Sequence, residues 1–159
     1  MKYFNLIFFL LLVFAGCSSS HNPGDIVQID IDKLRGAPSE VKLDGITYTL
    51  EAYIWRDFMP DIDTVTNKGL MASIKLKLTD NTPIPSTLKI TRLWILNKDY
   101  IWMPEPLRIT QLTSDVIEIY ASEGPLWEAG IKVRVVFEFI LNNQKLLLGL
   151  ENQEVQAVY

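Results

Sequence analysis

Alternation of apolar and polar residues with a period of two is the feature that most constrains the fold of this chain. It is clearest in residues 46–55, where five apolar side chains fall on one face while Tyr53 and Trp55 fall on the other. The same period recurs in residues 70–79 and 131–141. Because successive side chains of a strand point to opposite faces of a sheet, this pattern predicts half-buried β-strands. No stretch has the sustained i, i+3, i+4, i+7 spacing of an amphipathic helix.

Turn-forming residues separate the predicted strands. Asp44-Gly45 predicts a two-residue hairpin and Asn142-Asn143 a second tight turn, since these residues tolerate positive φ. Pro83 and Pro85 interrupt a strand because each removes a ladder donor. A break in the alternation near Arg92 predicts a β-bulge. Further strands are predicted over residues 26–32, 88–96, 116–121, 146–150 and 155–159.

About eight short strands separated by turn signals predict an all-β fold, most simply an antiparallel sandwich. The C-terminal half places Trp127-x-x-Gly130 before a long strand, a tight hairpin and a final strand. In this order it resembles the immunoglobulin-like domains of secreted bacterial proteins, although the Cys-Trp-Cys core signature is missing. The resemblance implies an antiparallel immunoglobulin-like β-sandwich, which we expect to form one domain over residues 25–159. A small barrel is the competing fold.

The charge and cysteine content exclude some classes of protein. The chain has 15 Lys and Arg against 19 Asp and Glu, a formal net charge of −4, and no basic run. Nucleic-acid binding needs clustered Lys and Arg, so we expect no nucleic-acid partner. Cys17 is the only cysteine, so the chain cannot form an internal disulfide and its fold must depend on its apolar core.

The first residues have the three parts of a secretory signal: Lys2 near the start, an apolar run from Leu6 to Phe14, and the small residues Ala15 and Gly16. A nine-residue helix is about 14 Å long, roughly half of a bilayer's hydrocarbon core. The run is therefore too short to serve as a transmembrane anchor.

Phe14-Ala15-Gly16-Cys17 resembles the lipobox of bacterial lipoproteins, approximately Leu-(Ala/Ser)-(Gly/Ala)-Cys, with Phe14 in place of the usual Leu. The resemblance implies that residues 1–16 are cleaved off as a signal peptide. Cys17 would then carry diacylglycerol and a further acyl chain such as palmitate, and several chains anchor a protein stably. The alternatives are an ordinary secretory signal with an incidental cysteine, or a short core helix.

We therefore expect a lipid-anchored protein of the bacterial cell envelope, with residues 17–24 as lipidated cysteine and flexible tether. Ser18 follows the cysteine where lipoproteins kept at the inner membrane often carry Asp. In a cell with two membranes this favours the outer one, with the protein facing the periplasm.

The sequence supplies little for catalysis. His21 is the only histidine and lies in the predicted tether, away from any nucleophile or second zinc ligand. Glycine-rich phosphate loops and dinucleotide fingerprints are missing. Asp57, Asp61 and Asp63 are the candidate metal ligands, since clustered carboxylates suit calcium. Their spacing matches no calcium loop, however, and we expect no metal, no cofactor and no enzyme activity.

Four aromatic residues and a neighbouring arginine are the candidate ligand-binding residues. Tyr53 and Trp55 fall opposite the core face, with Arg56 beside them, and Trp102 and Trp127 flank Pro- or Gly-rich connections. Exposed rings can anchor a protein partner or stack on a sugar; alternatively, the rings simply cover the core. We predict a non-enzymatic binding or accessory module for another envelope protein. The alternatives are a glycan-binding module that uses these rings, or a metal-binding envelope accessory.

Overall fold

The computed structural model describes residues 30–59 and 68–159. Within these ranges the chain is mostly β-strand, which confirms the all-β prediction. The elements are α1 (Ile31–Arg35), β1 (Glu40–Leu43), β2 (Ile46–Asp57), β3 (Met71–Leu78), the 3₁₀ turn η1 (Thr79–Asn81), β4 (Lys89–Asn97), β5 (Tyr100–Trp102), β6 (Arg108–Gln111), β7 (Val116–Ala121), β8 (Lys132–Leu141) and β9 (Gln144–Val158).

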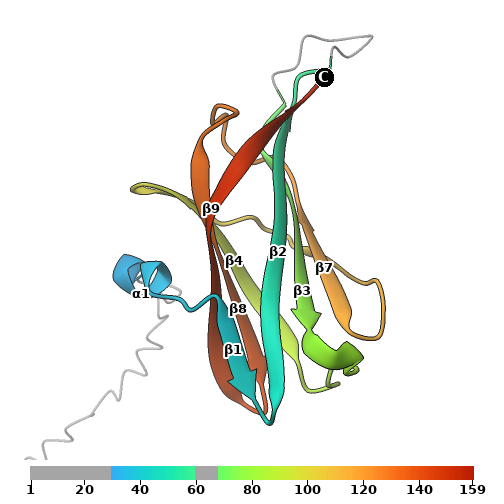
Figure 1. The fold of residues 1–159 in the computed structure, drawn as a ribbon. Helices are drawn as coiled ribbons and strands as arrows, with labels where there is room; N and C mark the ends of the chain where they lie inside the picture. The colour runs from blue at the N-terminus through green and yellow to red at the C-terminus, as the bar shows by residue number, and fades with distance from the viewer. Residues whose placement is uncertain (1–29, 60–67) are drawn as a thin grey trace, which may run out of the picture.

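The strands form one curled sheet in the order β5-β4-β8-β9-β2-β3-β7-β6, with β1 added to β2. β9 joins its two halves, as Figure 1 shows: most of the strand pairs antiparallel with β8, and Val155–Val158 then pairs parallel with the end of β2. The sheet is therefore mixed, and the expectation that it is antiparallel throughout is wrong at this pair. We call β1, β2, β3, β6 and β7 the first half-sheet, and β4, β5, β8 and the β8-paired part of β9 the second half-sheet.

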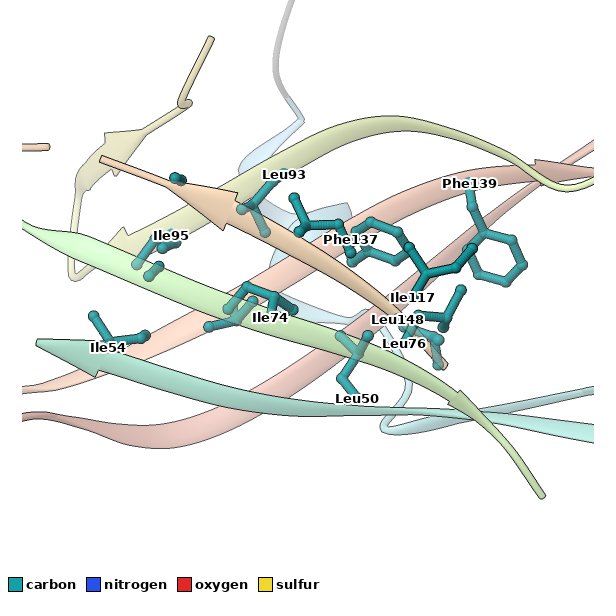
Figure 2. Close-up of a cluster of buried hydrophobic side chains, with 14 of the residues drawn as sticks. Leu50, Ile54, Ile74, Leu76, Leu93, Ile95, Ile117, Phe137, Phe139 and Leu148 are labelled. Carbon is teal, nitrogen blue, oxygen red and sulfur yellow. The ribbon is translucent and has the colours of Figure 1, made fainter. Parts of the chain in front are cut away.

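One apolar core lies between the two half-sheets. Ile74 and Leu76 of β3 and Phe137 and Phe139 of β8 are fully buried, and Figure 2 shows side chains from both halves directed toward one another. Burying a side chain of this size contributes roughly 1.5–3 kcal/mol. β3 alternates strictly between buried and partly buried positions, so the period-two prediction for this strand is confirmed.

The predicted turns are confirmed as well. Asp44-Gly45 joins β1 to β2 with φ angles of 53° and 80°. Asn142-Asn143 joins β8 to β9 with φ angles of 48° and 63°. The register of β4 against β8 shifts between Ile90 and Arg92, where the bulge was expected.

The strand predicted over residues 26–32 is wrong at its described end, because residues 31–35 form α1. The Asp30 carboxylate caps this helix by accepting a hydrogen bond from the Lys33 N–H at 3.1 Å. Capping satisfies a backbone donor of the first helical turn that otherwise has no partner. Residues 26–29 lie outside the described residues, as do the predicted signal peptide, Cys17 and the tether.

α1 packs on the outward surface of the second half-sheet, which we call the covered face (Figure 1). Leu34 and Ala37 bury Trp94, Leu96 and Val136 there. The segment after the helix is held by backbone contacts, since the Gly149 N–H of β9 donates to the Pro38 carbonyl at 2.7 Å.

Candidate functional site

The outward surface of the first half-sheet, which we call the open face, carries the main cluster of aromatic residues outside the core. The strand register sets Tyr53 of β2 opposite Ser73 of β3, and Ser73 opposite Tyr120 of β7. Tyr120 in turn faces Arg108 of β6. One line of side chains therefore crosses four strands, and Trp55 lies next to it on β2. We call Tyr53, Trp55 and Tyr120 the aromatic row.

The rings of the aromatic row contact one another. The Tyr53 and Trp55 centroids are 5.1 Å apart with an interplanar angle of 30°. The Trp55 and Tyr120 centroids are 6.1 Å apart at 53°, and the Arg108 guanidinium lies 5.8 Å from the Tyr120 centroid. Each ring pair contributes roughly 0.5–1.5 kcal/mol. Tyr53 nevertheless stays 50% exposed, so the row is an ordered aromatic surface in contact with solvent.

Polar groups border the aromatic row on the same face. The Ser73 hydroxyl donates to Glu118 Oε1 at 2.6 Å. Lys77 forms an ion pair with Glu51 of the neighbouring strand. Exposed pairs of this kind contribute little to stability, but they give the open face charges of both signs beside the rings.

Arg56, a predicted binding residue, points to the opposite side of β2 from Trp55 and is only 6% exposed. Its Nε donates to the Lys68 carbonyl at 3.3 Å and its Nη1 to the Trp127 carbonyl at 3.2 Å. The guanidinium also lies 4.9 Å from the Phe58 ring centroid. These contacts join β2 to two connections at one end of the core, which is a structural role. The structure does not bring Arg56 together with the aromatic row.

Trp102 and Trp127 also lie apart from the aromatic row. Both are partly buried and pack against the main core. The backbone at Gly124 lies close to the Trp102 ring, since a Cβ added at Gly124 would lie 2.8 Å from that ring. The two tryptophans, one on β5 and one in the connection between β7 and β8, thus fit the alternative in which the rings cover the core.

Asp57 belongs to the predicted carboxylate cluster. Its Oδ2 lies 2.7 Å from Lys68 Nζ, and its Oδ1 accepts the Met59 N–H at 2.8 Å. Asp61 and Asp63 lie outside the described residues, so their convergence with Asp57 stays a prediction. Among residues 30–59 and 68–159, no three His, Cys, Asp or Glu side chains are grouped so that they could hold a metal ion.

Tyr120 and Arg108 were not predicted as site residues. The alternation in residues 116–121 does place Tyr120 opposite the buried Ile117 and Ile119. What the pattern lacks is the pairing of β3 with β7, because β4, β5 and β6 lie between these two strands in the sequence. β6 was not predicted because its four residues contain one apolar side chain, Ile109, which is too few to show an alternation; all four are exposed.

Comparisons of the chain with protein-family models, with curated proteins and with solved structures find no match. In the part of the chain that the structure describes, no helix has the length and apolar character needed to cross a bilayer. Among the described residues, the feature that we consider further is the aromatic row with Arg108, on β2, β7 and β6.

Proposed function

We propose that this protein is a non-enzymatic, lipid-anchored module of the bacterial cell envelope that binds another envelope protein through its open face. The observation that carries the proposal is the aromatic row, which the described segments leave in contact with solvent. Tyr, Trp and Arg are the residue types that dominate binding energy at protein interfaces, and Met is enriched there as well. Met71 is the register partner of Trp55 on the same face.

The strand order supports an immunoglobulin-like sandwich as the framework of this module. β2-β3-β7-β6 follows the A-B-E-D order of such domains, and β4-β8-β9 follows C-F-G with β5 added at the edge of C. The hydrogen-bonded path ends at β5 and β6, which speaks against a closed barrel. Such a fold presents two outward sheet faces but does not itself specify a ligand.

The ring geometry favours a protein over a glycan. Interplanar angles of 30° and 53° make the aromatic row a ridged surface, whereas stacking along a sugar chain is best served by coplanar rings. A ridged surface bordered by both charge signs suits interdigitation with side chains. Glycan binding remains the second candidate, and the half-exposed Tyr53 ring is the observation in its favour.

Site-specific photo-crosslinking in the native envelope tests the partner. Benzoylphenylalanine at Tyr53 and at Tyr120 should give discrete crosslinks to one polypeptide, identified by mass spectrometry. The matched control is Tyr100 on β5, which is 71% exposed but lies away from the row. Crosslinking from Tyr100 equal to that from Tyr53 would contradict a specific surface. Crosslinks to glycan instead of polypeptide would select the second candidate.

The lipid anchor at Cys17 is proposed from the lipobox-like residues 14–17. Metabolic labelling with a palmitate analogue should modify the natural chain and not Cys17→Ala. The substituted chain should also lose the mass of the diacylglycerol and keep residues 1–16. Detection of the same labelled species in Cys17→Ala would remove the anchor from the proposal and leave the open face untouched.

A further inference from the structure

A groove of about 250 Å³ lies beside the covered face, at the end of the second half-sheet where α1 ends. Its charged and polar lining consists of Arg35, Lys98, Lys132, Arg134, Glu151 and Asn152. Four cations thus face one carboxylate, although these residues come from α1, the β4–β5 turn, β8 and β9. The fold, and not a basic run in the sequence, assembles the cluster. We call it the basic groove.

Two of the four cations hold the groove together. Arg35 Nη2 donates to Asp99 Oδ1 at 3.0 Å and to the Lys98 carbonyl at 3.3 Å. Arg134 pairs with Glu151, and its Nη2 donates to the Ala37 carbonyl at 2.6 Å. These contacts fix α1, the β4–β5 turn and β8 around the groove. The positive charge of the groove is also partly neutralised. Asp99 and Asp32, which are not part of the lining, both pair with Arg35, and Asp32 Oδ1 lies 3.9 Å from Arg35 Nη1.

The other donors have no acceptor among the described residues. Lys98 and Lys132 form no ion pair or side-chain hydrogen bond there, although Glu154 lies opposite Lys132 in the strand register. Arg134 Nε is buried and lacks a hydrogen-bond partner in the described part of the chain. Because Arg134 Nε is shielded from solvent, an anion in the groove would be bound by the two lysines, whose ammonium groups can each donate to several oxygens.

We propose that the basic groove binds the phosphate group of an anionic membrane lipid. A phosphate supplies several charged acceptor oxygens, which Lys and Arg donors match. The choice of a lipid rests on the proposed anchor at Cys17. The described chain begins at Asp30, next to α1. A segment of the length of residues 17–29 spans at most about 45 Å. The groove would then lie within reach of the headgroups of the membrane that holds the chain.

The test is an amide chemical-shift titration of the full-length chain in a neutral detergent, at constant ionic strength. The probes are dihexanoyl phosphatidylglycerol, inorganic phosphate, and dihexanoyl phosphatidylcholine, whose phosphate is balanced by its own cation. Shifts should concentrate at Lys98, Lys132 and Asn152. Phosphatidylglycerol should bind more tightly than the other two probes.

A charge-matched pair of double variants locates the binding. Lys98→Glu with Lys132→Glu should weaken phosphatidylglycerol binding by roughly tenfold or more, since two charged donors are lost. Lys42→Glu with Lys89→Glu makes the same change in net charge away from the groove and should leave affinity within about twofold. Retained amide dispersion shows that each variant folds, and Lys132→Glu alone serves if the turn at Lys98 does not tolerate its change.

Each possible outcome of the titration either supports or overturns the proposal. Equal loss in both double variants, or shifts spread over the surface, would overturn the groove as a site. Inorganic phosphate binding there as tightly as phosphatidylglycerol would overturn the lipid as its source and leave free phosphate as the ligand. Because the result is scored by shifts at the groove and not at Tyr53 or Tyr120, failure here is distinct from failure of the protein-binding proposal.

Discussion

The two outward faces of the curled sheet each carry a tryptophan, Trp94 on β4 and Trp55 on β2, in different surroundings. Trp94 is 4% exposed because Leu34 and Ala37 cover it. Trp55 is only partly buried, and its contacts are the neighbouring rings of Tyr53 and Tyr120. The chain thus supplies its own cover for one face and, in its described part, none for the other.

This difference separates aromatic residues that serve the fold from those available for binding. A tryptophan buried by its own chain contributes to stability through area removed from water. A ring left on an open sheet face contributes less to stability and retains area that a partner can bury. Substitutions on the covered face should therefore mainly reduce stability, whereas substitutions on the open face should mainly reduce binding.

The largest effect should come from Trp94→Ala, which removes the ring beneath α1. We expect a loss of about 3–5 kcal/mol in the free energy of unfolding, as for other large-to-small core substitutions. The buried Nε1 of Trp94 lacks a hydrogen-bond partner within the described residues, which is itself unfavourable. Because the substitution also removes this donor, we expect a loss near the lower end of that range. Urea unfolding measures it. Trp55→Ala is the matched variant and should cost only about 1–2 kcal/mol, so equal losses would break the comparison.

A smaller loss of stability should follow Gly149→Ala, which tests how the segment after α1 is held against β9. The added Cβ would lie 2.7 Å from the Ala37 carbonyl oxygen, where the 37–38 segment crosses β9. We expect a loss of about 1–3 kcal/mol and faster amide exchange at Leu34 and Ala37. Exchange that stays unchanged there would show that the covered face does not depend on this contact.

Tyr53→Ala should affect binding more than stability. The side chain is half exposed and its main contact is the Trp55 ring, so the loss of stability should stay within about 1 kcal/mol. Partner crosslinking from position 120 should fall by roughly tenfold, as for an interface anchor. Tyr100→Ala is the control and should change neither quantity. A large loss of stability without loss of crosslinking would assign Tyr53 to the fold.

The smallest effect concerns the core between the two faces. Burial, with a further contribution from the nearby Asp44 carboxylate, raises the pKa of Tyr48 above its ordinary value of 10.0. The unfolded chain therefore ionises first at this residue, so the contribution of Tyr48 to the free energy of unfolding should be constant below about pH 10 and fall as the pH rises toward the folded pKa. Tyr48→Phe should remove this part of the decline in alkaline urea titrations. An unchanged slope would contradict the assignment.

Local features of the sequence predicted much of the fold. The alternation of β3 and the Asp44-Gly45 and Asn142-Asn143 turns depend on neighbouring residues, and each is confirmed. α1 was missed because its five residues are too few for a helical period and the alternation from Ile26 suggested a strand. Its existence depends on the Asp30 cap and on burial of Leu34 against β4 and β8.

Features that depend on register between distant strands were not predictable. β9 was expected as two strands, since nothing local shows that one strand leaves β8 and joins β2. For the same reason, Tyr53 and Trp55 were predicted as outward-facing while Tyr120 and Arg108 were not added to them. The inward direction of Arg56 does follow from its alternation with Trp55, although its adjacency in sequence suggested a shared edge.

Protection of the open face in the native envelope tests the central claim most directly. Thr110→Cys places a thiol on this face beside Glu118, and Ser86→Cys places one in an exposed loop. Maleimide should modify the cysteine at position 110 about tenfold more slowly in intact envelopes than in the purified chain, if a partner occupies the face nine-tenths of the time. The cysteine at position 86 should react equally in both. Equal rates at position 110 would show that no partner covers the open face.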